Sequence, residues 1–86
     1  MIYLVDKPYA DVAGRVAQTD KDAEIVLIQD GVLLNPDHEI LELDVPVYAV
    51  DKDVAVRGAE LPSTVERLSY DTLVERILET EVRSFT

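Results

Sequence analysis

Three aspartates, Asp6, Asp30 and Asp51, each follow a short apolar segment that is typical of a β-strand. In an open parallel sheet the carboxyl ends of the strands lie along one edge, where ligands bind. Three carboxylates at that edge would offer the oxygen ligands that Mg²⁺ prefers, and a Mg²⁺ ion there could support phosphoryl transfer. Ser69 and Thr72 follow the last such segment and belong to the same predicted edge.

The same aspartates also have a structural interpretation. An Asp at a strand-to-helix junction accepts hydrogen bonds from backbone N–H groups and caps the helix. On this interpretation Asp30 and Gly31 form a tight turn and Asp51 begins a helix, while Lys7 and Lys52 partly neutralise the charge. Capping is favoured, because the same residue types recur at such junctions for structural reasons alone. A receiver-type phosphoacceptor domain would also be longer and would need a lysine after a fifth strand.

The other polar candidates are isolated. His38, the only histidine, lies in a polar loop without the partners that a catalytic triad or a metal site requires, so we expect its side chain to be solvated. Arg57 is followed by Gly58 in a predicted surface turn, where the basic side chain of Arg57 could contact a carboxylate or a phosphate. The four tyrosines, Tyr70 among them, form no stripe with interleaved Lys or Arg, which favours packing or interface roles.

The chain contains no cysteine. This excludes disulfides, thiolate metal sites and a cysteine nucleophile, so the chain cannot itself carry sulfur or perform thiol chemistry. The apolar run at residues 2–5 has no basic flank and is interrupted at Asp6, too early for a signal peptide or a membrane span. We therefore expect a cytoplasmic protein that does not enter a membrane.

The charge is strongly acidic. Eighteen Asp and Glu residues against eight Lys and Arg residues give a net charge of −10, and the acidic residues are dispersed along the chain. Such a field repels phosphate backbones, whereas binding to nucleic acid draws on Lys and Arg that displace counterions. We expect no direct binding to DNA or RNA.

Short apolar runs rich in β-branched residues predict strands. They cover residues 2–5, 24–29 and 45–50, with a weaker run at 65–69. Four successive apolar residues from Ile25 to Ile28 are typical of a strand buried on both faces, as in a parallel sheet covered by helices. A fifth strand over residues 81–85 is permitted by the spacing, and the sequence leaves it undecided.

Segments with helical spacing lie between the predicted strands, at residues 10–18, 52–57 and 70–80. Ser69 is suited to cap the last of these helices at its N-terminus, and Gly58 to end the second in a left-handed conformation. Residues 35–44, with at most one helical turn, and 58–64 are predicted loops. Apolar residues at helical spacing are expected on one face of each longer helix. They are Val12, Ala13, Val16 and Ala17 in the first, and Leu73, Val74, Ile77 and Leu78 in the last.

Strands that alternate with helices predict parallel β-α-β units with right-handed crossovers. The expected fold is a single α/β domain over residues 1–86, a three-layer α/β/α sandwich with a mainly parallel sheet of four or five strands. The apolar fraction of 48% is high for so short a chain, which buries only about 60% of its unfolded surface. We therefore expect a partner to cover part of the surface, and the isolated chain to form a dimer or larger assembly, or to aggregate.

Several landmarks, taken in order, give the chain a family resemblance. They are an apolar strand that runs into Gln29-Asp30-Gly31-Val32, a strand with Val47-Tyr48-Ala49 followed by acidic residues and Arg57-Gly58, and a helix start at Tyr70-Asp71. The opening strand, followed by Lys7-Pro8, also matches. In this order and spacing the chain resembles the TusB/DsrH family of sulfur-relay proteins along nearly its whole length.

The resemblance implies a DsrEFH-like fold and association with two related subunits, of the TusC/DsrF and TusD/DsrE types. Bacterial complexes of this kind pass persulfide sulfur toward 2-thiouridine at the tRNA wobble position, and a related complex serves dissimilatory sulfur metabolism. Some members carry a cysteine in the first helix, where residues 12–17 have none here. The implied role is therefore a noncatalytic supporting subunit without a cofactor, with the acceptor cysteine on the TusD/DsrE-type partner.

Two other functions remain open at this point. One is a homo-oligomeric regulatory or structural protein without relay activity, and the other is the Mg²⁺-dependent phosphoryl-transfer or receiver-like domain. No catalytic, cofactor-binding or metal-binding residue is assigned. The candidate strand-end or interface positions are Asp6, Gln29, Asp30, Gly31, Asp51, Arg57, Gly58 and Tyr70.

Overall fold

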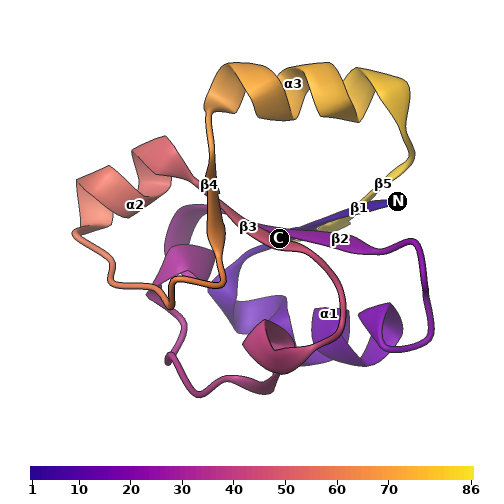
Figure 1. Ribbon diagram of the computed structural model, residues 1–86, viewed down its shortest axis with the longest axis horizontal. Helices are drawn as coiled ribbons and strands as arrows, with labels where there is room; N and C mark the ends of the chain where they lie inside the picture. Colours follow the sequence, from indigo (N-terminus) through magenta and orange to yellow (C-terminus); the bar gives the residue numbers. More distant parts are fainter.

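The computed structural model describes residues 1–86 and contains a five-stranded, all-parallel sheet in the order β4-β3-β2-β1-β5 (Figure 1). The strands are β1 (Ile2–Val5), β2 (Glu24–Leu27), β3 (Val47–Val50), β4 (Glu66–Leu68) and β5 (Val82–Phe85). The first four lie within the predicted runs. The undecided segment at 81–85 does form a strand, which pairs with β1 and lies at the edge of the sheet.

Three α-helices and three short 3-10 helices connect the strands. They are η1 (Lys7–Tyr9), α1 (Ala10–Ala17), η2 (Gln29–Leu33), η3 (Glu39–Glu42), α2 (Asp51–Arg57) and α3 (Tyr70–Glu79). The Ser69 hydroxyl accepts a hydrogen bond from the Thr72 N–H at 3.1 Å, and Gly58 ends α2 with a φ of 58°, so both predicted caps are confirmed. None of these helices has the length and apolar composition needed to cross a membrane.

The direction of the crossovers decides which face of the sheet each helix covers. From β1 to β4 each new strand is added on the same side of the last, and only the step from β4 to β5 runs back across the sheet. Right-handed crossovers that run in opposite directions lie on opposite faces. Accordingly α1 and η3 lie on one face and α3 lies on the other, which confirms the expected α/β/α sandwich (Figure 1). α2 lies beside the ends of the strands, and its buried Val54 belongs to the cluster on the α1 face.

The two faces of the sheet carry separate hydrophobic clusters of unequal size. The cluster under α1 and η3 has 15 buried residues, and the cluster under α3 has five. A helix is about 10 Å wide with its side chains, whereas five strands spaced about 4.8 Å apart span about 20 Å. One helix therefore cannot cover its face completely, and Leu4 and Ile28 on that face are only partly buried.

The predicted inner face of α1 is wrong in part. Ala10, Ala13, Gly14 and Ala17 are buried, while Val12 is 50% exposed. These four positions also have helical spacing, and their small side chains let α1 approach the sheet closely. Val16 is partly buried against the same cluster, so only Val12 is displaced from the inner face that hydrophobicity alone would give it.

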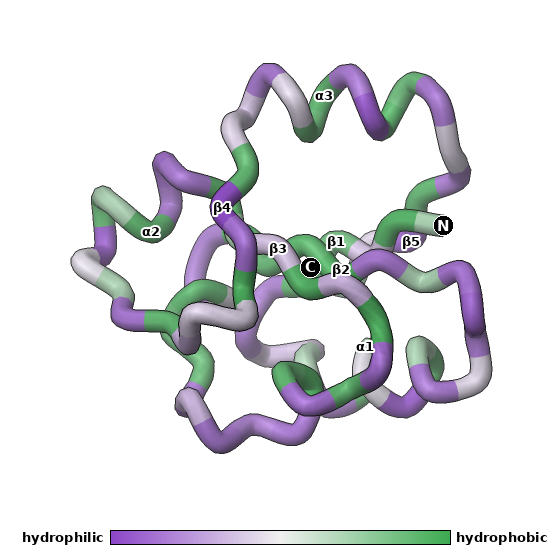
Figure 2. Tube along the Cα trace, viewed as in Figure 1, coloured by the Kyte–Doolittle hydropathy of each residue, from purple (hydrophilic) through white to green (hydrophobic).

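The predicted inner face of α3 also divides into two rows. Leu73 is buried and Ile77 half-buried against the sheet, whereas Val74 and Leu78 are exposed. Figure 2 shows hydrophobic and hydrophilic segments alternating along α3. Both rows have a four-residue spacing, so the pattern did not distinguish them.

His38 is not the solvated loop residue that the sequence predicts. Its side chain is only 18% exposed, its Nδ1 accepts a hydrogen bond from the Ile40 N–H at 3.1 Å, and its Nε2 lies 2.9 Å from Asp11 Oδ1. Because Nδ1 accepts, the proton of the neutral ring lies on Nε2, which donates to Asp11. His38 therefore joins η3 to α1 and has a structural role.

Candidate functional site

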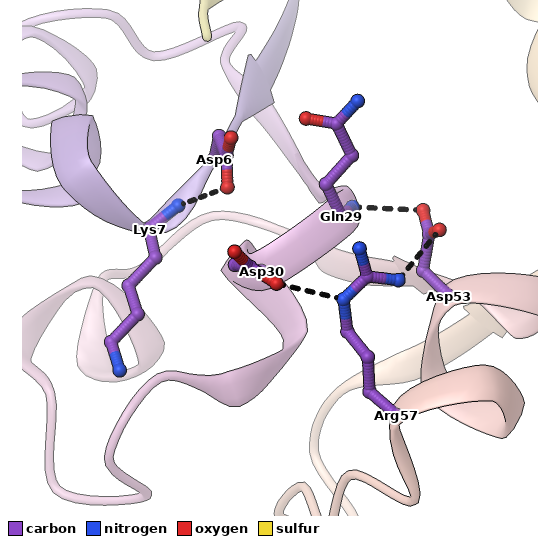
Figure 3. Close-up of polar contacts among 6 residues, drawn as sticks. All are labelled: Asp6, Lys7, Gln29, Asp30, Asp53 and Arg57. Carbon is purple, nitrogen blue, oxygen red and sulfur yellow. Dashed lines mark hydrogen bonds and ion pairs between the residues drawn. The ribbon is translucent and has the colours of Figure 1, made fainter.

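A polar cluster lies where β2 and β3 end, and it joins η2 to α2 (Figure 3). Arg57 Nε donates a hydrogen bond to Asp30 Oδ1 at 2.9 Å, and Arg57 Nη1 lies 3.3 Å from Asp53 Oδ1. The other oxygen of Asp53 accepts a hydrogen bond from the Gln29 N–H at 2.8 Å. The Arg57–Asp30 pair and the hydrogen bond from Gln29 to Asp53 thus hold η2 and α2 together.

The charge of Arg57 is strongly held within this cluster. The hydrogen bond to Asp30 is the main cause of a raised pKa at Arg57; partial burial opposes it, and the charges of Asp30, Asp53 and Asp6 add to it. Both contacts of the guanidinium are made to carboxylates of this chain. Arg57 therefore makes the predicted contact with a carboxylate, and because both carboxylates belong to this chain, the contact positions η2 against α2.

The three aspartates that were predicted at the strand ends have different structural roles. Asp6 accepts a hydrogen bond from the next backbone N–H at 2.7 Å and caps η1, as the capping interpretation predicts. Asp30 and Gly31 lie in η2, where the Gly31 N–H donates a hydrogen bond to the Ile28 carbonyl at 2.8 Å, so the tight turn predicted there is present. The Asp30 carboxylate makes no capping bond and pairs with Arg57 instead. Asp51 is the first residue of α2, as predicted, and makes no capping bond. No three Asp, Glu or His side chains in the chain lie close enough together to hold a metal ion.

Gln29 has an unusual backbone conformation. Its φ of 50° makes it the only residue other than glycine with a positive φ. A left-handed conformation costs an L-residue about 1 kcal/mol, and such strain tends to occur at functional sites. The hydrogen bond from its N–H to Asp53 holds the conformation, and its side chain points away from the cluster (Figure 3). Gln29 is therefore both strained and presented outward.

Replacing Gln29 with glycine should keep or raise the free energy of unfolding, by up to about 1 kcal/mol, because glycine adopts a positive φ without steric cost. Gln29→Ala is the matched control: it removes the same side chain but keeps the strained backbone, so it should not stabilise the protein. Urea denaturation followed by circular dichroism measures both variants. Clear destabilisation by Gln29→Gly relative to Gln29→Ala would show that the backbone is not strained there.

An apolar pocket of about 270 Å³ lies between α3 and the sheet, next to the polar cluster. Leu4, Ile28 and Val50 line it from the sheet, and Tyr70, Leu73, Val74 and Ile77 line it from α3. Gln29 and Asp53 complete the lining, so the pocket touches the polar cluster. The structure therefore brings together two predicted positions, Gln29 and Tyr70, around one pocket.

The remaining predicted positions lie outside this pocket, and one important residue was not predicted. Gly31 and Gly58 have structural roles, the first in a close backbone contact and the second as a helix end. Asp53, which contacts both Gln29 and Arg57, was missed. Its spacing of four residues from Arg57 within a predicted helix is the signal that would have found it, because residues four apart face each other on a helix.

The fold and the site define a small parallel α/β protein with a mixed apolar and polar surface at its strand ends. A family model described as "DsrH like protein" matches residues 8–82. Protein TusB from Pectobacterium carotovorum subsp. carotovorum (strain PC1) is 32% identical over 80 residues, which cover 84% of this chain and 84% of the relative. The chain belongs to the DsrH-like family, and the TusB/DsrH resemblance seen in the sequence is confirmed.

Proposed function

We propose that this chain is a noncatalytic subunit of a cytoplasmic sulfur-relay complex of the TusBCD/DsrEFH kind. Its partners are subunits of the TusC/DsrF and TusD/DsrE types. The complex would transfer persulfide sulfur for 2-thiolation of the tRNA wobble uridine or for related sulfur metabolism. The match to the DsrH-like family over residues 8–82 is the observation that carries this proposal.

Side-chain chemistry determines which subunit of the complex can carry the sulfur. A persulfide forms on a thiolate, and this chain has no cysteine to supply one. The sulfur must therefore be carried by a cysteine of another subunit, for which the TusD/DsrE-type partner is the candidate. What this chain contributes is binding, and the exposed surface around Gln29 and Tyr70 is suited to contact a partner.

Co-expression with the TusC-like and TusD-like proteins of the same genome tests the proposal. An affinity tag on the TusD-like protein should retain this chain through size-exclusion chromatography, and light scattering should give a mass larger than that of any single subunit. If the three proteins are folded but elute separately, and this chain assembles only with itself, it is a homo-oligomeric protein outside the relay.

A further inference from the structure

The outer side of α3 carries a row of exposed apolar side chains. Tyr70, Val74 and Leu78 are 62%, 42% and 81% exposed. They are spaced four residues apart, so they lie one above the other along one side of the helix. Tyr70 and Val74 also line the apolar pocket between α3 and the sheet, so the row continues into a cavity that a partner side chain could enter.

A second row, of carboxylates, runs beside the first. Asp71, Glu75 and Glu79 each follow one of the apolar residues, all three are exposed, and none takes part in an ion pair within the chain. The one cation of α3, Arg76, pairs with Glu24 of β2 and lies 4.9 Å from the centre of the Tyr48 ring. The unpaired charge on α3 is therefore entirely negative.

This charge pattern argues against a second copy as the occupant. In a two-fold dimer the same patch is used twice, so the two carboxylate rows would lie close together. Each copy also has a net charge of −10, and like charges across an interface oppose association. A partner surface that complements the two rows of α3 has an apolar centre, which contacts the apolar row, flanked by Lys or Arg, which pair with the carboxylates.

We propose that these six residues, the α3 face, form the docking surface for a different subunit, one that presents apolar side chains flanked by Lys or Arg. The proposal rests on the proposed function, because it identifies that subunit as a member of the relay complex. The sheet topology supports the proposal. α3 is the one helix on its face of the five-stranded sheet and leaves part of that face uncovered, so a subunit that docks on α3 would also cover the sheet beside it.

The first test measures binding to the TusC-like and TusD-like subunits by isothermal titration calorimetry. Leu78→Glu should weaken binding at least about tenfold, because a charge would enter the apolar centre of the interface. Val56→Glu is the matched control: Val56 is 76% exposed on α2 and belongs neither to the α3 face nor to the lining of the apolar pocket, so its replacement should change affinity less than about twofold. Both variants should retain the wild-type circular dichroism spectrum, because both side chains are exposed.

The second test examines the charge complementarity. Glu75→Lys combined with Glu79→Lys should weaken binding and reduce its dependence on salt, because salt screens the attraction that these carboxylates provide. The control pair, Glu42→Lys with Glu60→Lys, changes the net charge equally, but both residues lie outside α3, and Glu42 belongs to η3 on the opposite face of the sheet. It should have the smaller effect on both quantities.

The outcomes separate the docking surface from the proposed function. If the wild-type chain binds its partners and Leu78→Glu binds equally well, the α3 face is not the docking surface, while the proposed function stands. If the wild-type chain binds neither partner, both proposals fail. A salt-promoted dimer of the wild-type chain that Leu78→Glu abolishes would show that a second copy occupies the face, which would overturn the inference.

Discussion

Replacing Gly31 with alanine is expected to lower the free energy of unfolding by about 3 kcal/mol, or to prevent folding, because there is no space for a methyl group. A Cβ at this position would lie 2.3 Å from the carbonyl oxygen of Val5. That oxygen accepts a hydrogen bond from the Ile28 N–H at 3.0 Å, at the end of the β1–β2 pairing. Neither group can move without disturbing the strand ends that form the site.

Gly14→Ala is the matched control for this prediction. A Cβ there would meet Ile40 at 3.7 Å, an ordinary van der Waals contact, inside the α1 helix. Alanine favours a helix interior by about 1 kcal/mol over glycine, so this variant should be as stable as the wild type or more stable. Urea denaturation compares the two. Equal stabilities of Gly31→Ala and the wild type would contradict the close contact between η2 and β1.

The sheet could largely be predicted from local pattern. Residues 25–28 are all apolar, so the strand they form is apolar on both of its faces, and the strand at 24–29 could be predicted clearly. The alternation of strands with helices predicted the parallel arrangement. The segment at 81–85 was ambiguous because an edge strand needs few apolar residues. Only Val82 and Phe85 are apolar there, and both are only partly buried. Its pairing with β1 is a long-range property that local pattern does not contain.

The contacts within the site could be predicted only in part. The neighbourhood of Gln29 and Asp30 was expected at a strand end, but the partner of Asp30 is Arg57, 27 residues away. His38 was misjudged for the same reason, since its partner Asp11 is also 27 residues distant. A polar residue in a loop is solvated or held according to such distant partners, which spacing along the sequence does not show.

The exposed apolar row on α3 shows a second limit of prediction from the sequence. Leu73 with Ile77 and Val74 with Leu78 have the same spacing, so hydrophobicity predicts one wide inner face. A ten-residue helix that lies alone on a sheet buries only the row that points inward. The surplus of apolar residues was visible in the sequence, and the fold determines where that surplus is exposed.

Incubated alone with a cysteine desulfurase and ³⁵S-cysteine, this chain should acquire no label that a reducing agent releases. The thiolate is the reactive form in persulfide transfer, and the only sulfur here is the thioether of Met1. The TusD-like subunit, treated in parallel, is the positive control and should be labelled. Label on this chain that dithiothreitol removes would require a sulfur chemistry that its side chains do not provide.

The role of this chain in the relay is tested by the same labelling of the reconstituted complex, with and without this chain, resolved by non-reducing electrophoresis. We expect the label on a cysteine of the TusD-like subunit, within an assembly that contains this chain, and reduced transfer to the acceptor when this chain is omitted. Label transfer that proceeds equally well without this chain, with no complex formed, would contradict its role as a relay subunit.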